Sequence, residues 1–331
     1  MTSAAQGRQP QAAGIAADTP IQKVLHPTIA DLYRGNVMVP GRFEPHRTAG
    51  FCTRFQDVAA RTAEDIAESY GLDRVPGWPL GGPVHVLRFR AGQPALYRTS
   101  YGGNTVAGAR RMGTTTVLPP PFLGTGYTPS RSHVIPEYLL DLIELPAGTE
   151  MWQITESGEE RRVARYLHRQ SGWVNLAGAA FGPVGWWPPP VPLRPAVRRG
   201  IVVRFRGEEF DADPGPAAGQ LTLHPLPGRP APADFDDTDG IHTTVVSDAQ
   251  LDEVVRIRQL CTWRDAPFEL LDVGPNQAVL HFLGDDHGIA SELGLTQVDY
   301  CVWRAIASRS ELSEIRIETT NLGVQGVFGP A

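Results

Sequence analysis

The chain has 331 residues, of which 41% are hydrophobic and 20% charged, and its formal net charge is −6. This length predicts about two domains, each able to bury a core without disulfides or metal. No run of about 18 apolar residues is present and no secretory signal is recognisable, so we expect a cytoplasmic protein with no membrane partner. The cysteines Cys52, Cys261 and Cys301 lie far apart without C-x-x-C spacing, which predicts buried apolar residues and no metal or redox site.

The charge is divided unevenly along the chain. Residues 1–199 hold 21 Lys and Arg against 15 Asp and Glu, whereas residues 200–331 hold 9 against 21. This asymmetry fits attraction between two parts of the protein, a basic face for an anionic ligand such as a dinucleotide or nucleic acid, or simply two solvated surfaces. Lys23 is the single lysine, so the abundance of arginine most simply reflects a GC-rich coding sequence and by itself does not indicate phosphate binding.

The first half of the chain predicts a mixed α+β domain. Residues 1–24 lack apolar periodicity and predict a disordered tail, and residues 25–184 form the domain. An amphipathic helix is expected in VAARTAEDIAESYGL, where Ala59, Ala63, Ile66, Ala67 and Tyr70 share one face before Gly71 ends it. The expected strands are 31–35, 84–89, 95–100, 137–145 and 150–155, with a second helix at 105–112 and a charged hairpin over 156–174 that ends in a packed Trp173.

The second half predicts a duplicated β-rich domain after a proline-rich linker at 185–199. Phe210 aligns with Phe268, and QLTLHPL at 220–226 aligns with QAVLHFL at 277–283. We expect two repeats, 200–256 and 257–318, each too small to bury its own core, followed by a tail at 321–331. Ser247 and Ser308 carry helix-start signatures.

Arg34 in ADLYRG lies at the end of a predicted strand, followed by VMVPGRFEPHRTAGF. A strand-borne arginine can clamp a phosphate through a bidentate contact, although an arginine at a strand end is ordinarily a surface charge. LYR, then a proline and a GF downstream, resembles the opening strand of the ADP-ribosyltransferase toxins of the cholera and pierisin type. The resemblance implies that Arg34 holds the phosphates and ribose of NAD.

The segment ALYRTSYGG stands where that superfamily has its Ser-Thr-Ser strand. The resemblance implies that Thr99 and Ser100 are the matching hydroxyls and that Tyr101, or Tyr97, stacks on the nicotinamide. The chain departs from the pattern because Arg98 replaces the first hydroxyl residue. A Thr-Ser pair ordinarily just ends a strand.

The superfamily's catalytic glutamate would correspond to Glu137, which lies 103 positions after Arg34 in VIPEYLLDLIELPAGTEMWQI. A carboxylate suits the positive charge that develops as nicotinamide departs. Glu144 is the second candidate, and either glutamate could equally be a solvent-facing strand residue. The Gln/Glu-x-Glu pair of arginine-modifying members is absent because position 135 is Ile135, so the resemblance points away from an arginine acceptor.

Two functions follow as hypotheses. The first is an NAD-dependent, toxin-like ADP-ribosyltransferase or NAD glycohydrolase, with NAD as substrate, regulated by the acidic repeats. The second is a non-enzymatic protein-binding, immunity-like or regulatory protein whose partner meets those repeats; a structural assembly component would need exposed apolar surfaces. Nucleic acid is not favoured as a partner, since no motif for it is present. No metal is expected, because HFLGDDHG reads more simply as a Gly-Asp-Asp turn than as a site made of His281, Asp285, Asp286 and His287.

Overall fold

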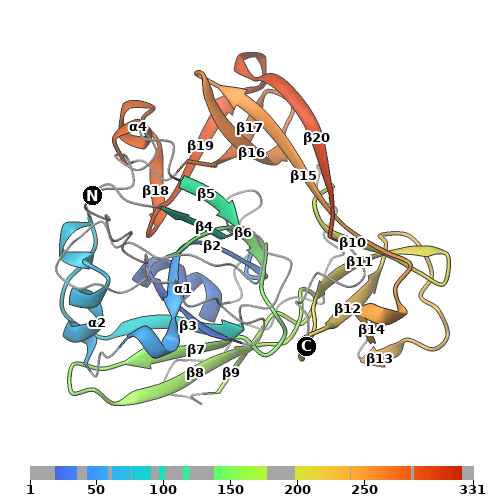
Figure 1. Ribbon diagram of the computed structural model, residues 1–331, viewed down its shortest axis with the longest axis horizontal. Coiled ribbons are helices and arrows are strands. Elements are labelled where there is room, and N and C mark those ends of the chain that lie inside the picture. The colour runs from blue at the N-terminus through green and yellow to red at the C-terminus, as the bar shows by residue number, and fades with distance from the viewer. Residues whose placement is uncertain are drawn as a thin grey trace, which may run out of the picture.

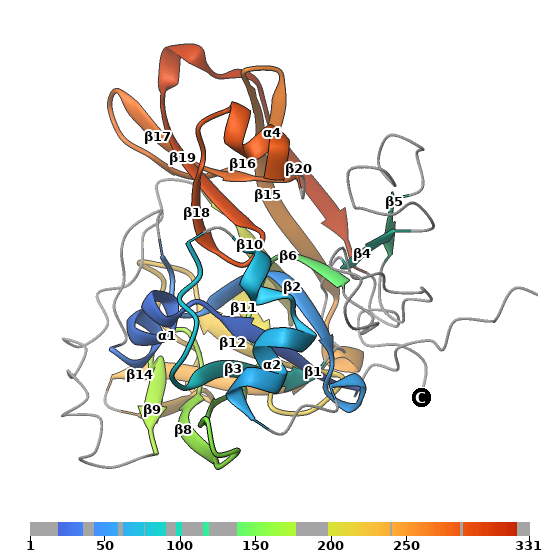
Figure 2. The same ribbon diagram turned by 90° about the vertical axis from the view of Figure 1, so that its left-hand side faces the viewer.

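The computed structural model describes residues 19–35, 43–58, 62–75, 77–90, 97–100, 115–118, 138–176, 198–238, 240–284 and 287–322. These residues form two antiparallel β-sheets with a few short helices (Figures 1 and 2). The chain is therefore mostly β, and the predicted fold class, a mixed α+β domain followed by a linked domain of two repeats, is wrong. The predicted helix at 105–112 lies outside the described residues, as do 185–197 of the predicted linker at 185–199 and 323–331 of the predicted tail at 321–331.

The first sheet has nine strands in the order β5-β4-β6-β2-β1-β3-β7-β8-β9. Their bounds are β1 Pro20–Leu25, β2 Arg47–Arg54, β3 Val84–Arg90, β4 Tyr97–Ser100, β5 Thr115–Leu118, β6 Tyr138–Glu144, β7 Glu150–Ile154, β8 Glu160–Tyr166 and β9 Trp173–Asn175. Strands were correctly expected at β3, β4, β6 and β7. The predicted disordered tail is wrong for Pro20–Val24, since β1 is a central strand whose Ile21 and Val24 are fully buried.

Two helices accompany this sheet, α1 (Pro27–Arg34) and α2 (Ala63–Ser69). The expectation of a strand at 31–35 is wrong, because the chain is already helical from Pro27 and the His26 side chain accepts the N–H of Thr28. The expected helix at α2 is confirmed: Thr62 and Asp65 form a capping box at its start. The 3₁₀ turns η1 (Phe55–Asp57) and η2 (Leu72–Arg74) lie on either side of α2.

The second sheet has eleven strands in the order β13-β14-β12-β11-β10-β15-β16-β17-β19-β18, with β20 paired to β15 beside this path. Their bounds are β10 Gly200–Phe205, β11 Glu208–Pro214, β12 Gln220–Pro225, β13 Asp236–Thr238, β14 Ile241–Ser247, β15 Glu253–Trp263, β16 Ala266–Val273, β17 Gln277–Phe282, β18 Thr296–Asp299, β19 Val302–Ser308 and β20 Ser313–Asn321. The remaining elements are the 3₁₀ turns η4 (Asp248–Gln250) and η5 (Arg309–Glu311) and the helix α4 (His287–Glu292).

The strand β15 runs through the predicted boundary between the two repeats. Its first part pairs with β10 and its last part with β16, while β20 pairs along much of its length. The boundary at 256/257 falls inside this one strand, although the buried residues on either side form two separate clusters, one over 201–254 and one over 261–307. The aligned segments lie on β12 and β17 of the same continuous sheet.

The two sheets share buried apolar clusters and form one body. Tyr300 packs with Phe51 and Tyr70 of the first half, and Val302 packs with Ala49 and with residues of β6 and β16. Gly50, with a φ of 101°, lets β2 approach the Tyr300 carbonyl so closely that a Cβ there would overlap it. In Figure 1 the second sheet extends from the lower right, at β10–β14, over the top of the first sheet, at β16–β19. Charged side chains from both sheets therefore meet in one interior.

Candidate functional site

A cluster of buried ion pairs lies where the end of β6 and the start of β2 meet the start of β10. Arg47 Nη2 lies 2.8 Å from Glu144 Oε1, and Arg47 Nη1 lies 3.5 Å from Glu44 Oε2. Arg199 Nη2 lies 2.5 Å from Glu44 Oε1. The Arg47, Arg199 and Glu144 side chains are exposed by 6% or less. Gly200 leaves room for them, because a Cβ there would lie 2.9 Å from Glu144 Oε1.

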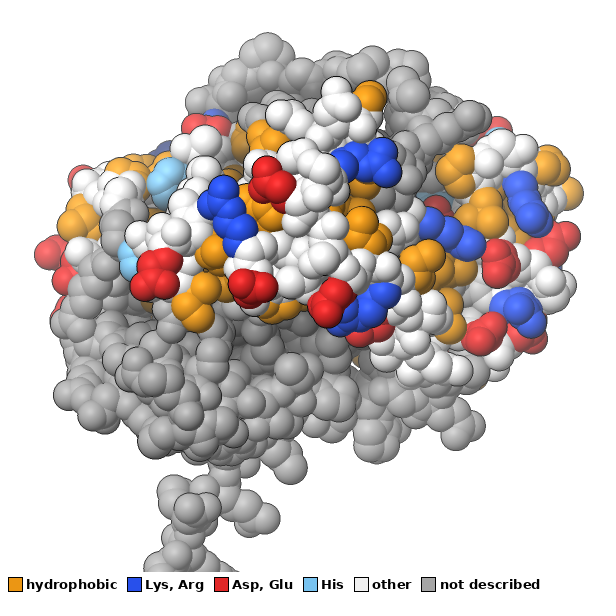
Figure 3. Space-filling model, turned by 90° about the horizontal axis from the view of Figure 1, so that it is seen from above, with side chains coloured by type: hydrophobic (Ala, Val, Ile, Leu, Met, Phe, Trp, Pro, Cys, Tyr) orange, Lys and Arg blue, Asp and Glu red, His pale blue; other side chains and the backbone are white. Residues whose placement is uncertain are grey.

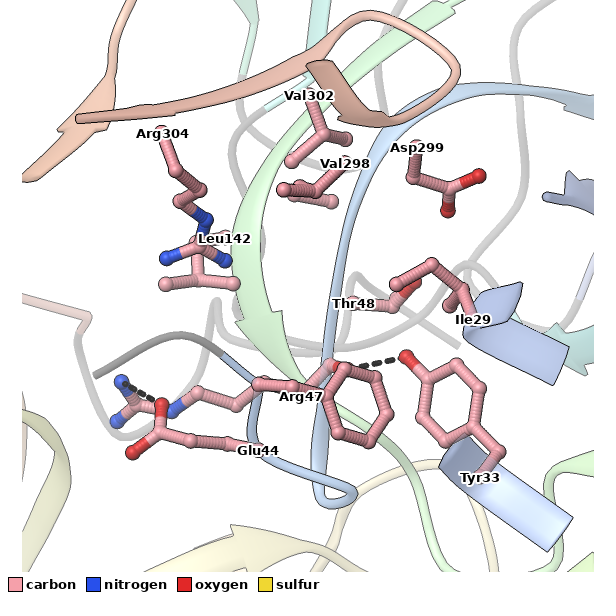
Figure 4. A pocket seen from close by; sticks show the side chains of 12 residues that line it. Ile29, Tyr33, Glu44, Arg47, Thr48, Leu142, Val298, Asp299, Val302 and Arg304 are labelled. Carbon is pink, nitrogen blue, oxygen red and sulfur yellow. Dashed lines mark hydrogen bonds and ion pairs between the residues drawn. The ribbon is translucent and has the colours of Figure 1, made fainter. Parts of the chain in front are cut away.

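The second sheet adds three more arginines to this cluster. Arg256 of β15 donates to the carbonyl of Leu142, and Arg258, two residues further along the same strand, pairs with Glu269 at 2.9 Å. Arg304 projects from β19 toward the space above Arg47 and Glu44 (Figure 4). The cluster thus joins β2 and β6 of the first sheet to β10, β15, β16 and β19 of the second.

The cluster carries more positive than negative charge. Counted over the described side chains alone, its members are five arginines and three glutamates, namely Arg47, Arg199, Arg256, Arg258, Arg304, Glu44, Glu144 and Glu269, an excess of two positive charges. Among the described residues, Nε of Arg47, Nε and Nη1 of Arg199 and Nε of Arg304 are buried without a hydrogen-bond partner. The described residues supply no acceptor to these donors, and Glu144 Oε2 in the same cluster is likewise buried without a donor.

The ionisation states maintain this excess. Burial opposes the charge on Glu44, but the guanidinium groups of Arg199 and Arg47 outweigh it and lower the pKa of Glu44 to about 2. Burial lowers the pKa of Arg304 to about 10, helped by repulsion from Arg199 and Arg47. Arg304 is still protonated near pH 7, so both the carboxylates and the arginines are charged.

A cavity opens beside the cluster, between α1, β2 and the strands β18 and β19 (Figure 4). It is open to solvent, has a volume of about 30 Å³, and is lined by Ile29, Tyr33, Phe43, Glu44, Arg47, Thr48, Ala49, Leu142, Val298, Asp299, Val302 and Arg304. Tyr33 donates its hydroxyl to the Arg47 carbonyl, and burial raises the pKa of Tyr33, which keeps it protonated. Asp299 is neutralised by Lys23 Nζ at 2.6 Å. Arg304 is thus the lining residue that makes no ion pair among the described residues, and Arg47, although paired with Glu144 and Glu44, has a buried Nε–H without a partner there.

The sequence-predicted site residues are not brought together in this cavity. Arg34 lies at the end of α1, where its guanidinium pairs with the exposed Asp31 at 2.9 Å, and it does not line the cavity. Thr99 and Ser100 lie on β4, paired with β5 at the edge of the first sheet. Tyr101 and Glu137 lie outside the described residues. The convergence of these residues on NAD therefore stays a prediction, although its premise of a strand-borne Arg34 is wrong.

Glu144, the alternative catalytic glutamate, belongs to the buried cluster. Burial opposes its ionisation, but Arg47 and Arg256 outweigh that effect and lower the pKa of Glu144. It is 2% exposed and does not line the cavity, so it is placed to balance the charge of Arg47. A role as a solvent-facing strand residue is excluded.

A serine and a histidine in contact at the β8–β9 turn do not form an activated nucleophile. His168 Nε2 lies 3.0 Å from Ser171 Oγ, while His168 Nδ1 accepts the Ser171 N–H at 3.4 Å. Burial lowers the pKa of His168 to about 4, so the ring is neutral near pH 7. Because Nδ1 accepts, the single ring proton sits on Nε2 and is donated to the serine, which leaves no base for its hydroxyl.

Ion pairs across the two halves account for part of the charge asymmetry. Arg169 of the basic half binds Asp213 of the acidic half through Nε and Nη2, and His224 also contacts Asp213 at 3.0 Å. Lys23 and Asp299 make a second such pair. Attraction between the two parts, one of the three alternatives left open by the sequence, is therefore realised inside the fold.

Sequence reasoning missed the arginine cluster. Its residues are scattered from Glu44 to Arg304, and each is common as a surface charge. The one local pattern is EVVRIRQL in β15, where Arg256 and Arg258 occupy alternate positions that turn out to be buried. Alternation of apolar and charged residues ordinarily places the charged face in solvent, so this pattern does not predict that Arg256 and Arg258 are buried.

Comparison with protein-family models, with curated proteins and with solved structures gave no match to this chain. Within the described ranges, no group of three or more His, Cys, Asp or Glu side chains is placed to hold a metal ion, and Asp285 and Asp286 lie outside those ranges. None of the helices in the described part of the chain has the length and hydrophobicity needed to cross a bilayer.

Proposed function

We propose that this chain is a binding protein for a small dianion, a phosphate ester or a dicarboxylate, whose charged group meets Arg304 and Arg47 at the cavity between its sheets. The observation that carries the proposal is the excess of two positive charges in the buried cluster, together with guanidinium N–H groups that have no partner among the described residues. Guanidinium groups match the planar oxygen pairs of carboxylates and phosphates.

Energetics favour a ligand at this place. An uncompensated charge taken out of water costs several kcal/mol even after relaxation. A dianion would neutralise the excess positive charge and accept hydrogen bonds from the buried donors. Its binding is therefore favoured both by the new hydrogen bonds and by the loss of the energetic cost of uncompensated buried charge. The cavity beside Arg47 and Arg304 gives a small ligand access to these groups.

Binding is favoured over catalysis by the state of the lining groups. Arg199 and Arg47 lower the pKa of Glu44, which keeps it ionised, and burial raises the pKa of Tyr33, which keeps it protonated. Asp299 is paired with Lys23. Neither Glu44 nor Tyr33 can therefore accept and return a proton near neutral pH.

The test is the thermal unfolding midpoint of the full chain in phosphate, sulfate and succinate, against chloride at matched ionic strength. A ligand at 100 times its Kd stabilises the folded state by about 2.7 kcal/mol. We expect dianions, and not chloride, to raise the midpoint, and isothermal titration calorimetry to find one site per chain.

The decisive variant is Arg304→Gln, with Arg204→Gln as its matched control because the Arg204 side chain is 51% exposed on β10. Arg304→Gln should weaken dianion binding at least tenfold without lowering the stability of the ligand-free protein, since it removes a charge that lacks a partner. Arg204→Gln should leave binding unchanged. Equal dianion binding by both variants, or no dianion effect on the wild type, would refute the proposal.

A further inference from the structure

The strand β20 forms an open edge of the second sheet. It pairs with β15 from Asn321 back to Ser313, and within the described ranges no strand pairs with its other side. In Figure 1 it runs along the right side of the upper part of the molecule. In an antiparallel ladder alternate residues direct both N–H and C=O to the same side, so half of the β20 backbone groups point away from β15.

This edge also exposes apolar side chains. Ile315 is 55% exposed and Ile317 is 68% exposed, and two-residue spacing places them on one face of the strand. Edge strands of stable monomers are usually protected by charged side chains, above all lysine, or by proline, β-bulges or short length. Residues 313–321 read SEIRIETTN, which contains neither lysine nor proline. Figure 3 shows hydrophobic side chains interspersed with acidic and basic ones on the upper side of the molecule.

The sequence of β20 is complementary to itself in one antiparallel register. A two-fold axis at Ile317 places Ile317 opposite its own copy, Ile315 opposite Thr319, and Arg316 opposite Glu318 twice. Opposite charges and apolar residues directly across an antiparallel pair stabilise it by roughly 0.2–1 kcal/mol for each pair. The register thus joins an apolar centre to two ion pairs.

The neighbouring registers are unfavourable. An axis at Arg316 would set Arg316 against itself and Glu314 against Glu318, and an axis at Glu318 would set two glutamates against each other. An axis at Ile315 would require Glu314 to pair with Arg316, but the φ of 50° at Glu314 shows that the start of the strand is irregular. Of these registers, only the one centred on Ile317 pairs residues of regular strand conformation and also places opposite charges across from each other.

We propose that the chain forms a two-fold homodimer by antiparallel pairing of β20 with β20 of a second copy, centred on Ile317. The two second sheets become one continuous sheet, and the contact is isologous, as a closed dimer requires. The occupant is a second copy because, in this register, Arg316 of each copy lies opposite Glu318 of the other, so the charges of the strand complement those of its own copy. This inference is independent of the anion site.

Sedimentation equilibrium of the full chain over a range of concentrations tests the dimer. The wild type should associate to a dimer. Arg316→Glu, which sets glutamate against glutamate, should weaken association at least tenfold, and the exchange of both charges, R316E with E318R, should restore it. Ile306→Lys, at a 45% exposed isoleucine of β19, should have no effect. A monomeric wild type, or a double exchange as weak as Arg316→Glu alone, would overturn the proposal.

Cysteine placement tests the register. Ile317→Cys should crosslink across the dimer with a bis-maleimide that spans one gap between strands, because the two residues face each other. Thr319→Cys should not, because its copy lies four residues away along the strand, at about 13 Å. The native Cys52 and Cys261 are buried, and the wild-type chain controls for Cys301. Crosslinking of Thr319→Cys without Ile317→Cys would contradict the register.

Discussion

The ion pair between Lys23 and Asp299 joins β1 of the first sheet to β18 of the second. Lys23 Nζ lies 2.6 Å from Asp299 Oδ2, and the two side chains are 0% and 7% exposed. Asp299 Oδ1 also accepts the backbone N–H groups of His26 and Tyr300. In Asp299→Asn the remaining carbonyl oxygen can still serve those two N–H groups, so the substitution removes mainly the counterion of a buried ammonium.

We expect Asp299→Asn to lower the free energy of unfolding by about 3–5 kcal/mol, the cost of leaving one partner of a buried pair uncompensated. The double variant Lys23→Met with Asp299→Asn removes both charges at similar volume and should recover most of that loss, because a buried ion pair replaced as a whole is often close to neutral. The effects of the two substitutions on the free energy of unfolding should therefore not add, and this non-additivity identifies the lost ion pair as the cause.

Equilibrium unfolding in urea at pH 7, followed by tryptophan fluorescence, measures both quantities. Asp234→Asn is the matched control, since Asp234 pairs with Arg206 at the same 2.6 Å but with side chains 54% and 66% exposed. An exposed pair contributes at most about 1 kcal/mol. The reasoning would be refuted by a loss below about 1 kcal/mol in Asp299→Asn, or by a double variant no more stable than the single one.

Four further outcomes are expected. Burial lowers the pKa of His46 and of His85 to about 4, below the value near 6.5 in the unfolded chain. The free energy of unfolding should therefore fall as the pH drops from about 6.5 to about 4, by about 3 kcal/mol for each histidine once it is fully protonated. Urea unfolding at pH 7 and pH 4.5 checks this, and equal stability at the two pH values would contradict it. Gly50→Ala should destabilise by about 3 kcal/mol in the same assay, because its Cβ would overlap the facing sheet and its φ is 101°. Asp265→Gly should stabilise by about 1 kcal/mol in thermal unfolding, because Asp265 has a φ of 59° in a two-residue hairpin turn. If the ADP-ribosyltransferase hypothesis holds, purified protein should release nicotinamide from NAD, and Glu137→Gln should abolish that release; no release from the folded wild type would end the hypothesis.

The sequence was most informative where the local pattern alone determines the structure. The strand at β3 and the helix at α2 follow from apolar alternation and from the Thr62 cap. Ser247 likewise forms the expected capping box with Gln250 at η4. In each case the residues that set the structure are close in sequence, so a single reading along the chain can find them.

The sequence was misleading where the structure of a segment depends on residues that are distant in the chain. β1 looked like part of a tail because its burial depends on β2 and β3, and α1 was missed because DLYRG was read without the helix start at Pro27. The arginine cluster could not be predicted, since Arg199 meets a glutamate 155 positions away. Buried charge balance is a property of the assembled sheets and leaves almost no local trace.

The distance in sequence between Lys23 and Asp299 also bears on how the chain is made. The partner of Lys23 lies 276 residues downstream. At typical translation rates this separation corresponds to tens of seconds. During that time the Lys23 ammonium group of β1 cannot be buried together with its counterion, Asp299. Final closure of the first sheet must therefore wait until β18 has left the ribosome, so the nascent chain depends on its last strands to complete its first.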